Sequence, residues 1–280
     1  MRFWLHVGRR FARSRTSVVS ALVLAGLVAA CIVVPLLSPY GANDIHFPDG
    51  REGPSRDHPL GTDLFGRDLL VRMAVGGRVS LLIGLGAIAV IVTVGLLYGA
   101  VAGLAGGKVD ATMMRLLDGF LALPRLPIMI VILVMAGLSA NLLTLIVALS
   151  IANWMVTARL VRAQVLSIRE SDYVRAAHAS GARGVRLLRR HVVPNVAGVL
   201  VVAAFLELPA IVLAEAFVSV LGLGVNPPTA TWGTIAQDGM TSGRLWLVLL
   251  PSLALAVFAV VANVVADGLN DALDPRRSAA

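Results

Sequence analysis

The chain contains stretches of more than twenty residues without a charged side chain. Three of them are residues 17–37, 79–103 and 245–266, and a longer stretch, residues 119–158, holds only Arg125. A helix of about 20 residues, rising about 1.5 Å per residue, crosses a hydrocarbon core of about 30 Å. The stretches therefore predict membrane-spanning helices and exclude an ordinary soluble fold.

The composition agrees with a membrane protein that has short loops. Apolar residues make up 58% and charged residues 14% of the chain, against about 45–50% and about 25% in soluble domains. The net charge of +8 would suggest nucleic acid in a soluble chain, but basic residues of multi-pass proteins collect in cytoplasmic loops. We therefore expect this chain to contact membrane lipid and not to bind nucleic acid. The single cysteine, Cys31, excludes an internal disulfide and a cysteine-based metal site.

The apolar stretches divide into six expected membrane spans. Residues 119–158 are too long for one span, and the small and polar residues at 137–141 favour a tight turn that separates two. A further span lies within residues 195–224. The sequence therefore predicts an all-α membrane protein with six transmembrane helices, of which residues 17–37 are the first and residues 79–266 hold the other five.

The first apolar stretch also fits a secretory signal, because residues 28–31 resemble a lipoprotein cleavage site. The stretch continues past Cys31 through residues 32–37 and is longer than the apolar core of a signal. We expect a retained span instead, preceded by a short basic segment at residues 1–16.

The distribution of lysine and arginine predicts the orientation. With the N-terminus inside, the inner segments hold 17 of these residues and the outer loops hold 6. Both terminal segments, residues 1–16 and 267–280, are therefore expected in the cytoplasm, together with a long inner loop at residues 159–195. Residues 38–78 form the expected extracytoplasmic loop.

This extracytoplasmic loop carries charges of both signs in a pattern typical of a short amphipathic helix. Asp63 and Arg67, and Asp68 and Arg72, stand four residues apart and are expected to pair. His58 with the two aspartates is the alternative, as a set of metal ligands, but a spacing of five residues spreads the acids around a helix. We expect no metal site here.

Glycines at positions 95, 99 and 103 recur every four residues, and Gly107 extends the series. Small residues at this spacing let two membrane helices approach closely. The series predicts a packing face between helices, and a hinge is the functional alternative.

The sequence contains no catalytic or nucleotide-binding pattern. Gly106-Gly107-Lys108 lacks the first glycine of a phosphate-binding loop and is followed by Val109 instead of serine or threonine. The sequence therefore predicts that this chain is not an enzyme and has no catalytic residue, cofactor or metal of its own. Any work driven by ATP requires another subunit.

The expected inner loop is much longer than the connections of about 2–8 residues usual in helix bundles. It is expected to form two short helices, one ending at Gly181 and one from Gly184 to His191. The first has a face of small side chains, including Val174 and Ala177, which favours docking into a groove of another protein. The second is rich in arginine and fits either anionic lipid or a protein partner.

One pattern in this loop is specific: residues 175–177, then Gly181, then the ending His191-Val192-Val193-Pro194-Asn195. It resembles the EAA loop of the transmembrane subunits of ABC importers, in the form found in the dipeptide, oligopeptide and nickel family. Further stretches that resemble the second permease subunit of this family lie within residues 58–68, 172–174, 221–233 and 267–275.

The resemblance implies a type I ABC importer permease fold in a bacterial inner or plasma membrane. It also implies a second homologous permease, two ATP-binding cassette ATPase subunits that hold ATP and Mg²⁺, and an extracytoplasmic binding protein. The residues that it places in the ATPase-coupling loop are Tyr173, Arg175, Ala176, Ala177, Ser180, Gly181, His191 and Pro194. Three positions depart from the family, since Arg175 replaces its usual Glu, Asn270 its usual Arg and Ala266 its usual Gly. The first of these reverses a charge beside the expected docking surface.

The expected function is that of a membrane subunit that forms half of a pathway for dipeptides or oligopeptides and couples ATP hydrolysis by its partners to uptake. Import of nickel or another small solute is the alternative, followed by a self-sufficient secondary transporter. Such a carrier would place several titratable residues at mid-membrane. Here the fifth span offers Glu207 and Glu215, on either side of Pro209, and Arg125 stands near the expected inner end of the third. The two glutamates are candidate pathway residues, with a polar anchor between helices as the alternative for Glu215.

Overall fold

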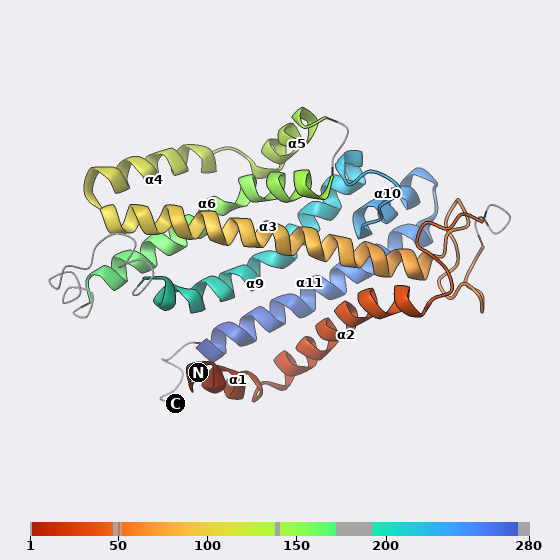
Figure 1. The fold of residues 1–280 in the computed structure, drawn as a ribbon, viewed down its shortest axis with the longest axis horizontal. Helices are drawn as coiled ribbons and strands as arrows, with labels where there is room; N and C mark the ends of the chain where they lie inside the picture. The colour runs from red at the N-terminus through yellow and green to blue at the C-terminus, as the bar shows by residue number, and fades with distance from the viewer. Residues whose placement is uncertain (1, 47–49, 51, 138–140, 172–191, 274–280) are drawn as a thin grey trace.

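Helices are the regular elements of the part of the chain that the computed structural model describes, residues 2–46, 50, 52–137, 141–171 and 192–273 (Figure 1). In chain order they are α1 (Arg2–Phe11), α2 (Arg15–Leu37), α3 (Leu69–Ala105), α4 (Gly107–Leu121), α5 (Arg125–Met135), α6 (Leu142–Arg169), α9 (Val193–Val218), α10 (Trp232–Thr241) and α11 (Leu245–Leu273). A π-helical turn, Ser219–Leu223, follows α9. The predicted all-α class is confirmed.

Five helices are long and apolar enough to cross a membrane: α2, α3, α6, α9 with its π-helical turn, and α11. α4 and α5 meet the same criterion only together, and the chain bends by 82° between them. Pro124, the N-cap of α5, accounts for the bend, because proline has no N–H and disfavours helix at the residue before it. The six predicted spans are present when the bent pair counts as one, and the third of them is a broken helix.

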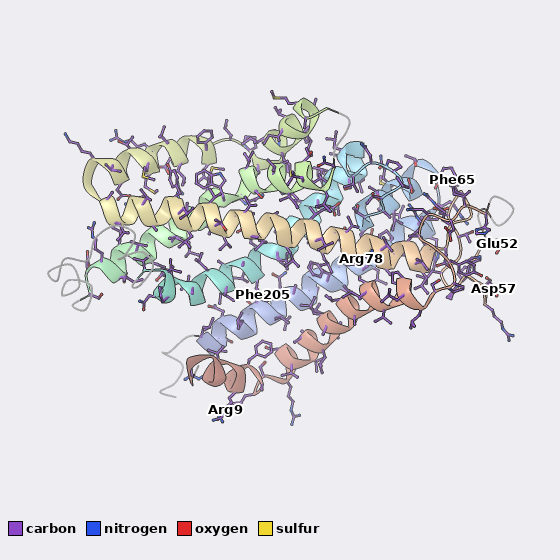
Figure 2. The ribbon with its side chains drawn as sticks, viewed as in Figure 1. Arg9, Glu52, Asp57, Phe65, Arg78 and Phe205 are labelled. Atoms are coloured by element: carbon purple, nitrogen blue, oxygen red, sulfur yellow. The ribbon has the colours of Figure 1, made fainter. Side chains whose placement is uncertain are left out.

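α3 is the longest helix and forms the axis of the bundle. In Figure 1, α6 and α9 run beside it, α2 and α11 lie along another side, and α4 and α5 flank α3 and α6. α1 packs against the last turns of α11, where Phe11 lies close to Gly268. Figure 2 shows Arg9 of α1 at this end of the molecule and Glu52 and Asp57 at the opposite end. α1 and the end of α11 therefore lie on the same side, as an even number of crossings requires.

α3 begins earlier than the sequence predicts, at Leu69. Its N-cap is Asp68, whose side chain accepts a hydrogen bond from the Val71 N–H at 2.8 Å. The short amphipathic helix predicted to lead into the second span is present only from Leu69 onward, because residues 63–67 are not helical. The charged positions belong instead to irregular turns and to the first turns of α3.

α6 continues to Arg169 and so includes the first part of the predicted inner loop. Two arginines that mark the end of the apolar stretch, Arg159 and Arg162, form ion pairs with Asp118 and Asp110 of α4. Arginine is a good helix former, so α6 extends beyond the end of the apolar stretch, and the ion pairs join this part of it to α4.

The turn predicted between the third and fourth spans is confirmed at both ends. Gly137 has a left-handed backbone with φ of 79°, which glycine adopts without steric cost. Asn141 caps α6 by accepting a hydrogen bond from the Thr144 N–H at 2.9 Å. Residues 138–140 lie outside the described part of the chain.

The predicted glycine face joins α3 to α6. An added Cβ at Gly95 would lie 2.7 Å from Thr157 Cγ2, and one at Gly99 would overlap the carbonyl oxygen of Ala158. Gly103 meets α6 at similarly short distances. The fourth glycine of the series instead begins α4 and has open space around it, so it is not part of this face. Close approach of two backbones is how helices associate where lipid provides no hydrophobic drive.

Replacing Gly99 with alanine should lower the stability of the protein by about 1–3 kcal/mol, because overpacking forces the two helices apart. Gly26→Ala on α2 is the matched control, since a Cβ there meets nothing within 4 Å. The thermal aggregation midpoints of the detergent-solubilised variants measure the difference. An unchanged midpoint for Gly99→Ala would contradict the close packing of α3 on α6.

Candidate functional site

Most of the residues predicted for the ATPase-coupling loop lie outside the described part of the chain: Tyr173, Arg175, Ala176, Ala177, Ser180, Gly181 and His191. The two short helices predicted for this loop lie there too. Pro194 is described and is exposed in the first turn of α9, where proline is tolerated because the first N–H groups of a helix have no partner within it. The coupling role therefore stays a prediction, and the structure adds the two helices that flank the loop, α6 and α9.

Glu215 of α9 is completely buried in a polar contact between three helices. Its carboxylate accepts hydrogen bonds from Ser219 Oγ at 2.7 Å and from Ser80 Oγ of α3 at 2.9 Å. The Trp232 N–H, the first of α10, donates to Ser80 Oγ at 3.3 Å. The network ties α10, a helix that the sequence analysis did not predict, to α3 and α9. This burial favours the alternative of a polar anchor for Glu215, and its place in the pathway lining stays a prediction.

Glu207 lies two turns earlier on α9 and is half-buried. Thr157 Oγ1 of α6 donates to Glu207 Oε2 at 3.4 Å. Thr157 is also the residue whose methyl group fills the space beside Gly95, so the packing of α3 on α6 holds the hydroxyl in position. At about 1.5 Å per residue, Glu207 is about 20 Å from the start of α9, near the middle of the span. It keeps exposed surface that Glu215 lacks.

Arg125 is the residue whose place the sequence analysis judged wrongly. It was expected near the inner end of the third span, but its Nη1 donates to Asn153 Oδ1 at 3.1 Å, and Asn153 is about 16 Å along α6 from its start at Leu142. The reason is the break before α5, because α4 occupies the first half of the span and Arg125 begins the second. Pro124 directly precedes Arg125 and Pro127 follows it by two residues. These prolines are the sequence signal that could have revealed the break in the helix.

Four side chains from three helices therefore meet at mid-depth, and we call Arg125, Asn153, Thr157 and Glu207 the mid-span polar cluster. Arg125 and Glu207 carry opposite formal charges, yet among the described residues neither forms an ion pair within 4.0 Å. Each is held by a neutral partner, Asn153 or Thr157. The cluster thus presents two opposite charges that do not neutralise each other by direct contact.

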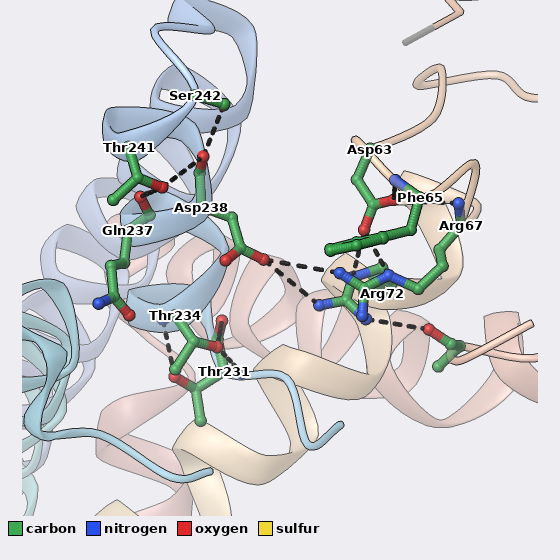
Figure 3. Close-up of polar contacts among 11 residues, drawn as sticks. Asp63, Phe65, Arg67, Arg72, Thr231, Thr234, Gln237, Asp238, Thr241 and Ser242 are labelled. Carbon is green, nitrogen blue, oxygen red and sulfur yellow. Dashed lines mark hydrogen bonds and ion pairs between the residues drawn. The ribbon is translucent and has the colours of Figure 1, made fainter. Parts of the chain in front are cut away.

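A second group of charges lies at the N-terminal end of α3 and is drawn in Figure 3. Arg67 Nε and Arg72 Nε lie 2.6 and 3.3 Å from Asp63 Oδ2, and both guanidinium groups lie 3.7 Å from Asp238 Oδ2 of α10. Burial raises the pKa of Asp238, and the positive charges of Arg72 and Arg67 oppose that rise. These arginines and Asp238 line part of a cavity of about 430 Å³. The group holds two positive and two negative charges, and its ion pairs join the loop before α3 to α10.

The ion pairs predicted for this loop are half correct. Asp63 and Arg67 pair as expected. Asp68 and Arg72 do not pair, because Asp68 caps α3 and its Oδ2 lies 2.8 Å from His58 Nδ1, while Arg72 turns to Asp63. Asp68 and Arg72 keep the helical spacing of four residues, so the predicted pair is absent because the carboxylate of Asp68 already has its partners and not because of the spacing.

Comparison with known proteins matches nearly the whole chain. The model of the family described as binding-protein-dependent transport system inner membrane component matches residues 95–279. The model described as the N-terminal TM domain of oligopeptide transport permease C matches residues 2–54.

Three relatives illustrate the similarity. The oligopeptide transport system permease protein OppC of Escherichia coli K12 is 41% identical over 98% of this chain and 91% of its own length. The protein of the same name from Bacillus subtilis strain 168 is 38% identical over 98% of this chain and 90% of its own length. The dipeptide transport system permease protein DppC of that strain is 37% identical over 96% and 84%.

Replacing Glu215 with leucine should destabilise the protein strongly, because it leaves the buried hydroxyls of Ser80 and Ser219 without their acceptor, at about 1–3 kcal/mol for each such group. Glu215→Gln keeps one acceptor oxygen and should cost less. Thermal unfolding of the two variants in detergent compares them. Equal stability of wild type and Glu215→Leu would show that the network does not hold α10 in place.

Proposed function

The chain belongs to the family of binding-protein-dependent transport system inner membrane components, and from this membership we propose that it forms half of the translocation pathway of an ATP-driven peptide importer. It is a multi-pass protein of the inner membrane. The observation that carries the proposal is its identity of 37–41% with oligopeptide and dipeptide permeases over nearly its full length.

The proposed partners are a second homologous permease, two ATP-binding cassette ATPase subunits and an extracytoplasmic binding protein. ATP and Mg²⁺ would bind on the ATPase subunits, since the sequence of this chain has no phosphate-binding loop. The exposed surface at the start of α5 supports contact with a neighbouring protein or with water. Arg125 is exposed there between Leu123 and Leu126, which are 51% and 42% exposed. A charge at mid-depth is costly against lipid, so this face would meet the second permease or the pathway.

The coupling step is proposed to run from the inner loop to the mid-span polar cluster through two rigid helices. α6 enters the loop and carries Asn153 and Thr157, and α9 leaves it and carries Glu207. A displacement of the loop by the ATPase subunits would therefore move both walls of the cluster, in the manner of rigid-body switching between two packed states. The loop lies in the cytoplasm in this proposal, as the lysine and arginine count indicates.

Transport by the reconstituted complex tests the proposal. Vesicles that hold this chain with its partner subunits should take up labelled dipeptides or oligopeptides when ATP and the loaded binding protein are present, and not when the ATPase subunits are omitted. This chain alone should neither bind nor hydrolyse ATP. Peptide uptake by the chain alone under a proton gradient would contradict the proposal, and so would ATP-driven uptake of Ni²⁺ without uptake of peptide.

Replacing Gly181 with leucine should reduce transport steeply while the protein remains in the membrane. The residue lies outside every span that the sequence predicts, and a bulky side chain there would obstruct docking of the small-residue face onto an ATPase subunit. Insertion of the loop at a lipid surface predicts the opposite, because one more leucine would strengthen membrane contact by about 1–2 kcal/mol. Uptake and co-purification of the ATPase subunits are measured together. Normal values for both would exclude the coupling role.

A further inference from the structure

The mid-span polar cluster has the composition of a ligand site more than that of a structural contact. The same α6 shows what a structural ion pair looks like in this protein: Arg162 Nε and Nη2 donate to the two carboxylate oxygens of Asp110 at 2.5 and 2.6 Å. Halfway along the helix, Arg125 and Glu207 contact Asn153 and Thr157, which lie one helical turn apart on α6, and they do not form such a pair with each other. Two opposite charges at mid-depth are left with capacity for other partners.

Neutral side chains fix both charged groups in place. Asn153 Nδ2 donates to the Leu149 carbonyl oxygen at 2.8 Å, which turns Oδ1 of the amide toward Arg125 at 3.1 Å. Thr157 is 2% exposed and packed against α3, and its hydroxyl reaches Glu207. Asn153 and Thr157 orient the charges without neutralising them, and Arg125 keeps most of its five N–H donors unused by the cluster.

The backbone next to Arg125 also indicates contact with protein or water. The chain is irregular between α4 and α5, where it bends by 82°. Irregular backbone at membrane depth is tolerated where protein buries it or where it lines an aqueous cavity, and broken helices at mid-depth carry the substrate sites of many transporters. This backbone therefore indicates that the open side of the cluster meets protein or water instead of lipid.

We propose that Arg125 and Glu207 form a peptide-binding station within the pathway, in which Arg125 binds the C-terminal carboxylate and Glu207 binds the N-terminal ammonium group. The inference rests on the proposed function and adds the substrate atoms that this chain recognises. A guanidinium group binds a carboxylate through two parallel hydrogen bonds. The two termini are the charged groups that every unmodified peptide shares, so a station for them accepts peptides of varied side chains.

Uptake of matched peptides by the complete complex tests the station. The peptides are trialanine, its C-terminal amide and its N-acetyl form, each supplied on binding protein that is saturated according to its measured affinity. Arg125→Gln should lower the uptake of trialanine about 10-fold or more, as loss of a charge-assisted hydrogen-bond pair implies, and should affect the amide much less. Glu207→Gln should show the same selectivity against the N-acetyl form.

Control variants separate recognition from folding. Arg115→Gln removes an exposed arginine of α4 away from the cluster and should leave all three uptake rates unchanged. Arg125→Lys keeps the charge but loses the bidentate geometry, so it should retain part of the preference for the free carboxylate. Co-purification of the subunits and ATPase stimulation by the binding protein should stay normal in every variant.

Distinct results would overturn the station and the proposed function. In Arg125→Gln and in Arg125→Lys, uptake of trialanine could fall by the same factor as uptake of its amide, or neither rate could fall. Both results would show that Arg125 does not bind the carboxylate. An amidated peptide with an internal glutamate should behave as the plain amide does, and a regained dependence on Arg125 would assign the arginine to side-chain carboxylates instead. Failure of the wild-type complex to take up any peptide with ATP would reject the proposed function before the variants are compared.

Discussion

The structure depends on the close approach of α3 and α6 through their glycine face. A membrane offers helices no hydrophobic gain on association, so packing must come from backbones that touch. Gly95, Gly99 and Gly103 provide this contact, and each leaves no space for a side chain. Thr157 shows the consequence most directly, because its methyl group packs on Gly95 while its hydroxyl reaches Glu207 of α9. Because α6 is fixed in this way, its side chains also fix polar groups of α4, α5 and α9.

α6 uses its remaining faces to hold charge in two different ways. Near one end, Arg162 closes on Asp110 of α4 in a bidentate ion pair that fixes the first half of the broken span. At mid-depth, Asn153 holds Arg125 of the second half without neutralising it. This contrast within one helix is the basis for the binding role proposed for Arg125. α6 and α9 also flank the inner loop. The loop proposed to be moved by the ATPase subunits is therefore connected directly to the helices that carry the mid-span polar cluster.

The sequence predicts the membrane class, the number of spans and the glycine face because each depends on local pattern. An uncharged run of 21 residues or glycines at every fourth position have few other physical explanations. Contacts between distant residues were not predictable in the same way. Nothing near Glu215 in the sequence points to Ser80, which is 135 residues away, and α10 packs inside a segment that reads as a loop.

Two of the errors arise because hydropathy shows where a segment is apolar but not where its helix breaks or ends. Arg159 and Arg162 lie within α6 although the apolar stretch ends before them, and the helix breaks at Pro124 inside a stretch that hydropathy treats as continuous. The motif in the inner loop gave the family from residues alone, and family models and relatives bear this out. The roles of its individual residues remain predictions.

Solvent contact beside Arg125 tests the central claim most directly, namely that the mid-span polar cluster faces the pathway and not lipid. A spin label at position 126, in the complete complex with Cys31 replaced by serine, reports collisions with oxygen and with a water-soluble nickel chelate. A label at Leu22, which is 67% exposed on α2, gives the reference for lipid. The account predicts that position 126 is more accessible to the chelate than position 22 is. Equal, oxygen-dominated accessibility at the two positions would place Arg125 against lipid and contradict the account.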